Sequence, residues 1–134
     1  MKDILITNNT NIKFIDKIKE SLAKCINCYF SVSFIKKAGL VLFEKELETA
    51  LKRGVAVKII TSTYQNFTDI ASLELFSKFQ KLYSNFECHL DLNCFGDNGF
   101  HSKGYIFECD NEVEFIVGST NITRYAILKN IEWN

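Results

Sequence analysis

Hydrophobic residues in the first half of the chain switch between helical and strand-like spacing. Apolar positions recur every three or four residues early in the chain, which predicts an amphipathic helix carrying Ile12, Ile15, Ile18, Leu22 and Ile26. Residues 29–35 then have the composition of a strand, 40–51 return to helical spacing ended by Gly54, and 55–60 form a second strand. This order, with short connections, predicts a right-handed crossover between parallel strands.

The second half continues the pattern and then changes character. Hydrophobic spacing predicts a third helix over residues 70–82, a strand over 86–92 and a turn at 97–99. Two short apolar runs, 103–109 and 113–119, are separated by a polar tripeptide, which is the spacing of a β-hairpin. Together the elements predict an α/β fold in which a mixed β-sheet is flanked by helices on both faces.

The predicted hairpin brings four polar side chains to one face of the sheet. If it turns about Asn111, His101 lies opposite Asn121 and Lys103 lies opposite Ser119, with paired Cβ atoms about 5 Å apart. Residues two apart on a strand share a face, so the imidazole, ammonium, hydroxyl and amide groups converge in this arrangement.

A hairpin register shifted by one residue is the alternative, and it places Gly118 and Thr120 on that face instead. The first register is favoured because it pairs apolar residues with one another, as in Phe107 with Phe115. Its weakness is Glu108 opposite Glu114, a like-charge pair that costs roughly a few tenths of a kcal/mol or more.

Composition fits a single domain over residues 1–134. The chain has 47% hydrophobic residues and 12 phenylalanines, which is enough for one core. No apolar run reaches the roughly 20 residues of a membrane-spanning helix, and the N-terminus lacks the order of a signal peptide. We therefore expect a cytoplasmic protein without a membrane partner. The strand-like residues 131–133 at the end of the chain suggest an N-terminal fragment of a longer protein.

Charge and cysteine content exclude little. The net charge is zero, with +5 over residues 1–60 and −5 over residues 61–134, which neither requires nor forbids a polyanionic partner. The five cysteines are expected to be reduced, since no export signal is present. Cys25 and Cys28 have the spacing of a metal or redox pair. A redox pair is not favoured, because they close a helical pattern instead of opening one. A zinc site would also need Cys88 and Cys94, whose five-residue gap is not a usual ligand spacing, so buried thiols are favoured and no metal is expected.

The quartet of His101, Lys103, Ser119 and Asn121 suits phosphoryl transfer. Histidine can act as a nucleophile and titrates near neutrality, while ammonium, hydroxyl and amide groups donate hydrogen bonds to phosphate oxygens. The sequence lacks a Gly-rich nucleotide loop, a cluster of carboxylates for a metal and a convincing Ser-His-Asp order. Each of the four residues taken alone also has an ordinary structural explanation.

The spacing of these residues resembles the signature of the phospholipase D superfamily. His101-Ser102-Lys103 is followed by Gly118-Ser119-Thr120-Asn121 and then Asn130-Ile131-Glu132, matching a histidine-x-lysine strand, a glycine-serine-x-asparagine strand and a downstream glutamate. Residues 32–35 and 61–64 look like segments of phospholipase D-like nuclease domains attached to bacterial DEAD/DEAH-type helicases and some restriction enzymes. The chain departs from the family at Glu108, where a supporting aspartate is usual.

The resemblance implies a phospholipase D-like fold and a two-step hydrolysis that uses no metal and no cofactor. One histidine attacks phosphorus to form a phosphohistidine, and a second histidine protonates the leaving oxygen and later activates water. Mapped onto this chain, Lys103 and Asn121 hold non-bridging oxygens, Ser119 supports the phosphate, and Glu132 orients a histidine.

The resemblance also implies a homodimer, because the mechanism needs two histidines. The other histidine, His89, lacks a lysine two positions on and reads as structural. Two His101 side chains would therefore face each other across a twofold axis, with the active site at the interface. The expected substrate is nucleic acid, DNA being favoured, and the expected activity is that of an endonuclease. The alternative is a non-catalytic module of a helicase or restriction protein that binds a phosphate backbone or dimerises its parent.

Aromatic residues outside the motif allow two interpretations. Tyr64, Phe67 and Tyr125 could stack on nucleobases, but in a chain this rich in phenylalanine a place in the core is favoured.

Overall fold

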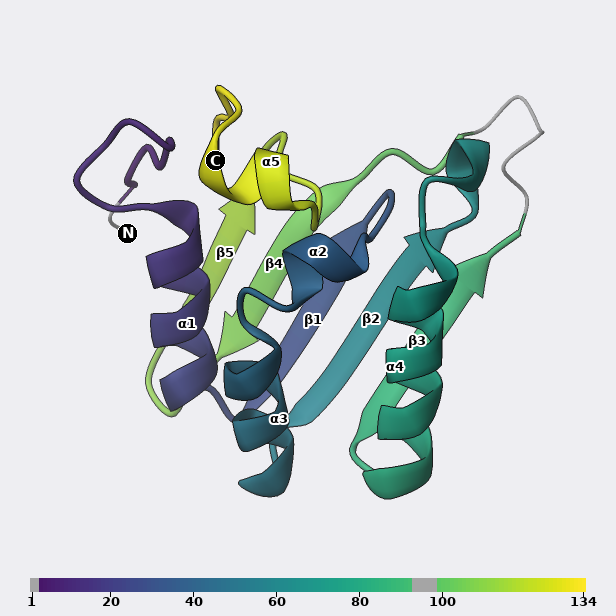
Figure 1. Ribbon diagram of the computed structural model, residues 1–134. Coiled ribbons are helices and arrows are strands. Elements are labelled where there is room, and N and C mark those ends of the chain that lie inside the picture. The colour runs from purple at the N-terminus through teal and green to yellow at the C-terminus, as the bar shows by residue number, and fades with distance from the viewer. Residues whose placement is uncertain (1–2, 93–98) are drawn as a thin grey trace.

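The predicted crossover of the first half of the chain is present in the structure. The computed structural model describes residues 3–92 and 99–134. Strands β1 (Asn27–Val32) and β2 (Ala56–Ser62) lie side by side and pair in parallel, which confirms the expected connection (Figure 1).

The helical stretch between β1 and β2 is divided into two helices, α2 (Lys37–Leu40) and α3 (Glu44–Lys52). Gly54 ends α3 with a φ of +94°, the left-handed conformation that glycine adopts without steric cost. The amide of Val55 donates to the carbonyl of Ala50 at 3.1 Å, and this bond closes a Schellman cap. The predicted role of Gly54 is therefore confirmed.

The remaining elements lie close to their predicted positions. The first helix begins at Phe14 and leaves Ile12 and Ile26 outside it, both exposed. The predicted turn at 97–99 falls outside the described residues except for Gly99. The other elements are α1 (Phe14–Lys24), the 3-10 turn η1 (Tyr64–Asn66), α4 (Ile70–Leu82), β3 (Phe86–Asp91), β4 (Lys103–Glu108), β5 (Val113–Val117) and α5 (Arg124–Leu128).

The described strands form one mixed sheet in the order β3-β2-β1-β4-β5. β3 pairs with β2 in parallel, while β4 pairs with both β1 and β5 in antiparallel fashion. One edge of the sheet, the upper edge in Figure 1, therefore holds the C-terminal ends of β1, β2, β3 and β5. The start of β4 lies at the same edge. We call this the carboxyl edge. The α/β class and the mixed sheet are confirmed.

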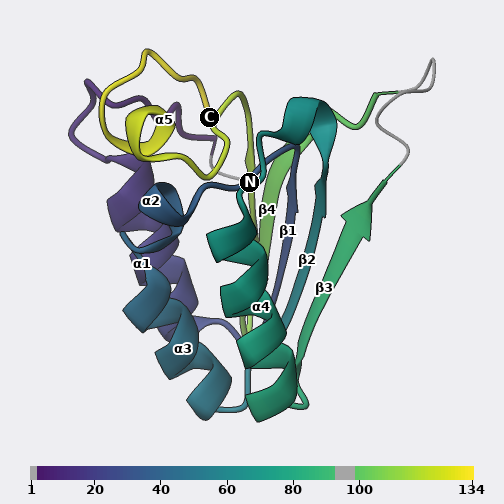
Figure 2. The same cartoon turned by 45° about the vertical axis from the view of Figure 1, so that its right-hand side comes forward.

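Helices cover one face of the sheet, whereas the sequence pattern had suggested both faces. In Figure 2 the helices of the described residues all lie on the same side. Burial agrees, because inward residues of β1 and β2 such as Phe30 and Ile59 are buried while Lys58 and Ile60 on the other face are exposed. Within the described residues, no helix has the length and apolar character needed to cross a membrane.

The favoured hairpin register is wrong by one residue. β4 and β5 pair with Tyr105 opposite Ile116 and Phe107 opposite Glu114, which is the alternative register. Phe115 and Val117 consequently point to the uncovered face, where both are more than half exposed.

Charge explains why the shifted register is stable. Glu114 turns toward α1, where its carboxylate accepts hydrogen bonds from Lys17 at 2.8 Å, Lys24 at 2.7 Å and Ser21 at 2.5 Å. Glu108 lies on the opposite face and accepts a hydrogen bond from Asn27 at 2.7 Å. The like-charge pair that weakened the first register is thus absent, because the two carboxylates point to opposite faces.

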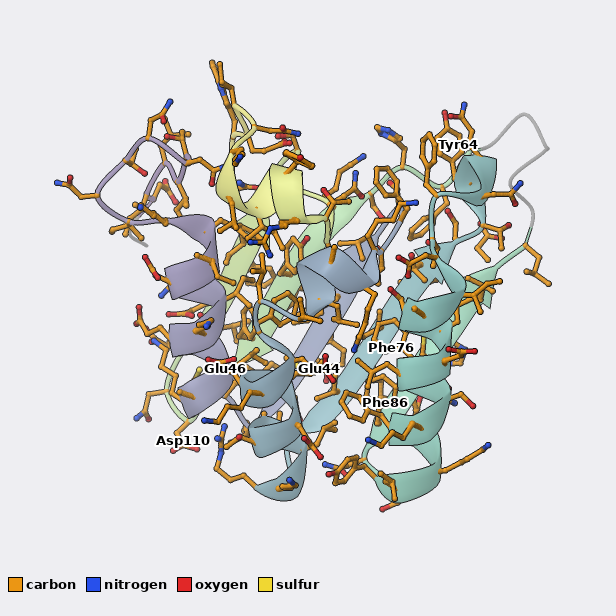
Figure 3. The ribbon with its side chains drawn as sticks, viewed as in Figure 1. Glu44, Glu46, Tyr64, Phe76, Phe86 and Asp110 are labelled. Atoms are coloured by element: carbon orange, nitrogen blue, oxygen red, sulfur yellow. The ribbon has the colours of Figure 1, made fainter. Side chains whose placement is uncertain are left out.

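The core between helices and sheet is largely aromatic. Phe76 of α4 and Phe86 of β3 meet there with ring centroids 5.6 Å apart (Figure 3). Phe30 of β1 contacts Tyr105 of β4 edge to face at 5.2 Å, one of the favourable geometries for aromatic pairs.

Two of the cysteines belong to this core. Cys25 and Cys28 are buried free thiols at the junction of α1 and β1, as favoured from the sequence. Cys94, another possible zinc ligand, lies outside the described residues.

Candidate active site

His101 and Lys103 meet at the carboxyl edge, at the start of β4. The Lys103 ammonium lies 2.9 Å from Nδ1 and 3.1 Å from Nε2 of the imidazole and donates to the His101 carbonyl at 2.8 Å. Lys103 itself pairs with Val32, the last residue of β1. The His101 imidazole and the Lys103 ammonium, which are two residues apart in the sequence, are therefore in direct contact.

Lys103 is a buried cation. It is 8% exposed, and burial lowers the pKa of its ammonium below the ordinary value of 10.5, while the negative charge of Glu132 acts in the opposite direction. A cation in such surroundings is poorly hydrated. It therefore interacts more strongly with a bound anion than an exposed lysine does.

Ser119 reaches the same region by a route that the hairpin does not provide. β5 ends at Val117, and the Ser119 amide then donates to the carbonyl of Trp133 at 3.0 Å. The Ser119 hydroxyl donates to the carboxylate of Glu132, and the Trp133 amide donates to the Ser119 oxygen at 3.1 Å. The last residues of the chain thus hold Ser119 and Glu132 together, with Glu132 near enough to Lys103 to act on its charge.

Glu132 therefore has a different contact within this chain from the one the resemblance implied. Its carboxylate accepts from Ser119 and, at 3.3 Å, from the side-chain amide of Asn130. Among the described interactions His101 instead contacts Lys103 and, ring to ring, Tyr64.

Asn121 is positioned by the end of β1 and the start of α2. Its Oδ1 accepts a hydrogen bond from the amide of Phe34 at 3.4 Å, and the side chain is 8% exposed. The next residue, Ile122, forms a parallel bridge with Ile35 and accepts from the Lys36 amide at 2.8 Å. These backbone contacts bring Asn121 to the carboxyl edge from outside the hairpin.

Serine hydroxyls at the strand ends join the segments that carry the site. Ser33 donates to the carbonyl of Ser102 at 3.2 Å, and Ser62 donates to the carbonyl of Ser33 at 2.7 Å. Sequence reasoning assigned these residues only to family-like segments. A signal was present for Ser62, because hydroxyl residues follow directly after the predicted strand 55–60, where parallel sheets place their sites, whereas Ser33 lay inside the predicted strand 29–35.

The other candidate residues lie away from this cluster. Glu108 accepts hydrogen bonds from Asn27 at 2.7 Å and from Tyr29 at 3.4 Å at the opposite end of β4. His89 is exposed on β3, 3.5 Å from the carboxylate of Glu87. Within the described residues, no group of three or more His, Cys, Asp and Glu side chains could hold a metal ion.

Comparisons with known proteins identify the family of this chain. The family model described as "Cardiolipin synthase, PLD-like domain" matches residues 12–134, a range that includes His101, Lys103, Ser119, Asn121 and Glu132. A comparison with curated proteins finds no match.

Among solved structures, the chain is similar to the crystal structure of Nuc, a phospholipase D family member from Salmonella typhimurium. The TM-score is 0.60 and the sequence identity is 27%, over 88% of this chain and 70% of that chain. Because the family model spans nearly the whole sequence and a solved member has the same fold, the chain belongs to the phospholipase D-like family.

Proposed function

We propose that the protein is a phosphodiesterase that cleaves nucleic acid through a phosphohistidine intermediate. The observation that carries the proposal is the contact of the His101 imidazole with the buried ammonium of Lys103, beside the Ser119–Glu132 pair. A nucleophile next to a poorly hydrated cation suits attack on a phosphodiester, whose charge must be neutralised during the reaction.

In the proposed first step, a ring nitrogen of His101 attacks phosphorus. The phosphorus–nitrogen bond forms as the bond to the leaving oxygen breaks, and a second imidazole donates a proton to that oxygen. Lys103 and Asn121 hold the non-bridging oxygens, and Ser119 supports the phosphate in the position set by Glu132.

In the second step, the imidazole that gave its proton takes one from water. The water oxygen attacks phosphorus, the phosphorus–nitrogen bond breaks, and both histidines return to their initial protonation states. The chain uses no metal or cofactor in this scheme.

The second imidazole is proposed to be His101 of another copy of the chain. A twofold axis near the carboxyl edge would place two His101–Lys103 pairs on either side of one phosphodiester, with the active site shared by a homodimer. His89 is not suited to supply the second imidazole within one chain, because it is on β3 beside Glu87, and β2 and β1 lie between β3 and β4.

Hydrolysis of a small chromogenic phosphodiester in EDTA tests the proposal. We expect turnover by the wild-type chain and its loss in His101→Ala, while His89→Ala, a matched change at the other histidine, remains active. Sedimentation should show a dimer, and an excess of His101→Ala chain should inactivate the wild-type chain if two chains build one site, because each mixed dimer then lacks one of the two histidines. Equal loss in His101→Ala and His89→Ala would contradict the proposal.

A second candidate is a module of a helicase or restriction protein that binds the phosphate backbone without cleaving it. The same buried Lys103 and Asn121 favour it, because both are donors to an anion whether or not His101 reacts. Two results together would support this candidate. The wild-type chain would bind DNA with an affinity that depends on Lys103, and it would release no product from any phosphodiester. Hydrolysis of anionic phospholipid in place of nucleic acid would assign the site to lipids, as the name of the matching family model suggests.

A further inference from the structure

Three aromatic side chains from two separate segments meet beside the candidate active site. Phe34 follows β1, while Tyr64 and Phe67 lie at and just after the 3-10 turn η1. The rings of Phe34 and Phe67 are 5.1 Å apart, and those of Tyr64 and Phe67 are 6.2 Å apart. We call Phe34, Tyr64 and Phe67 the aromatic platform. Figure 3 shows Tyr64 at the carboxyl edge, at the opposite end of the molecule from Asp110.

The platform is continuous with the catalytic candidate. The ring of Tyr64 lies 6.1 Å from the imidazole of His101 in an edge-to-face arrangement. Successive nucleotides of a strand rise by about 3.4 Å in a duplex. When a phosphodiester is held at His101, the base that lies near the Tyr64 ring is therefore one or two nucleotides along the strand.

Hydrogen bonds hold the platform rigidly against the strand ends. The hydroxyl of Thr68 donates to the carbonyl of Ser62 at 2.7 Å and accepts from the Ile35 amide at 3.2 Å. Between Tyr64 and Phe67, the residues Gln65 and Asn66 have φ of 48° and 56°, a left-handed conformation that non-glycine residues adopt at a cost. Tyr64 and Phe67 are thus kept side by side by a tight, anchored turn.

Exposure separates the platform from the core, where the sequence had favoured placing these rings. Phe67 is 39% exposed, whereas the core rings Phe30 and Phe76 are each 1% exposed. Lys36 places its ammonium 5.9 Å from the centre of the Phe67 ring. An aromatic surface with a cation over one of its rings offers stacking for a base and a charge for the neighbouring phosphate.

We propose that the aromatic platform stacks on an unpaired base next to the phosphodiester held by His101 and Lys103, so that the site takes single-stranded nucleic acid. The proposal rests on the proposed function and specifies its substrate. In a duplex both faces of each base are already stacked, and a protein ring can replace a neighbour only where the strand is single or opened. Stacking is tolerant of sequence because every base has a π-face.

Binding measurements with Tyr64→Leu and Phe67→Leu test the proposal. Each change keeps an apolar side chain and removes the aromatic face. Tyr125→Leu is the matched control, because Tyr125 is 65% exposed on α5 with the ammonium of Lys129 5.6 Å from its ring centre. All variants are made in a His101→Ala chain, so that binding is measured without cleavage, and circular dichroism checks that each is folded.

The probes are a fluorescent single-stranded DNA oligonucleotide, its duplex, and a strand of the same length in which the bases are replaced by abasic sites. We expect the single strand to bind more tightly than the duplex. Tyr64→Leu and Phe67→Leu should each weaken binding of the single strand by about tenfold. Tyr125→Leu should leave it unchanged, and the abasic strand should bind equally to the variants and their parent.

Several results would overturn the platform. These are binding of the duplex as tight as that of the single strand, equal weakening for the normal and abasic strands, or equal weakening by Tyr125→Leu. Binding of anionic phospholipid vesicles that depends on Tyr64 and Phe67, with DNA binding unaffected, would assign the rings to a lipid surface. Failure of the proposed function looks different, since the wild-type chain would then cleave no phosphodiester while the single strand still bound through Tyr64.

Discussion

The backbone of Gly118 passes so close to Trp133 that a Cβ atom added at Gly118 would lie 1.9 Å from the Trp133 carbonyl oxygen. The neighbouring Ser119 amide donates to that same oxygen at 3.0 Å. The glycine of the Gly-Ser-x-Asn motif is therefore required for space, because any side chain would push away the segment that carries Glu132.

We expect Gly118→Ala to lower the free energy of unfolding by about 1–3 kcal/mol, the usual effect of overpacking. It should also greatly reduce phosphodiester hydrolysis, since the contact between Ser119 and Glu132 depends on this close approach. Thermal unfolding and a chromogenic phosphodiester measure the two effects.

Gly104→Ala is the control for Gly118→Ala, because a Cβ at Gly104 on β4 meets nothing within 4 Å. It should be neutral or slightly stabilising, as alanine restricts the unfolded chain more than glycine does. Equal loss of activity in both variants would show that the close approach at Trp133 does not matter.

A second close approach positions Asn121. A Cβ at Gly39 in α2 would lie 2.6 Å from Cα of Thr123 and 2.7 Å from the carbonyl carbon of Ile122. Because both neighbours are backbone atoms, they cannot rotate away. Gly39→Ala should therefore destabilise the chain by about 1–3 kcal/mol despite the better helix propensity of alanine, and should weaken substrate binding through Asn121. Unfolding in urea and the KM for a small phosphodiester test this, and a variant as stable and active as wild type would contradict it.

Replacement of Lys103 should separate activity from stability. Burial lowers the pKa of Lys103, so folding disfavours its charged form, and the uncharged side chain of Lys103→Met avoids that cost. We expect a higher melting temperature at pH 7 together with a loss of about 10²–10³-fold in hydrolysis.

The gain in stability of Lys103→Met over the wild-type chain should shrink as pH rises. It is present below the lowered pKa of Lys103 and disappears as pH rises past 10.5, where the unfolded lysine also loses its proton. Melting curves of both chains between pH 7 and 11 check this, and a gap that widens at alkaline pH would contradict it.

Glu114 should make the fold sensitive to acid. Burial raises the pKa of its carboxyl, but hydrogen bonds from Lys17, Lys24 and Ser21 outweigh that effect and lower the pKa from 4.5 to about 2. The carboxylate therefore contributes about 3 kcal/mol that is fully present above pH 4.5 and is lost as pH falls toward 2. Glu114→Gln should be destabilised by a similar amount at pH 7 and should show a flatter acid profile in urea titrations.

Glu112→Gln is the matched control for Glu114→Gln. The Glu112 side chain is 61% exposed and pairs with Lys24 at 3.1 Å, and exposed pairs of this kind contribute about 0–1 kcal/mol. Equal destabilisation by Glu114→Gln and Glu112→Gln would mean that the burial of Glu114 does not add to the free energy of unfolding.

The sequence by itself determined the features that depend on neighbours along the chain. Hydrophobic periodicity located the helices and strands, and Gly54 marked the end of α3, because these are decided by local backbone preferences. The contact of His101 with Lys103 was also predictable, since two positions on one extended segment fix their relation.

Only the tertiary structure decided the rest. The hairpin register depends on Glu114 meeting Lys17 and Lys24 of α1, and hairpin pairing alone does not contain that contact. Ser119 and Asn121 reach the carboxyl edge through Trp133 and Phe34, from beyond the end of β5. These placements depend on which buried charges and backbone groups find partners in the folded chain. The spacing of residues along the sequence does not predict those partners.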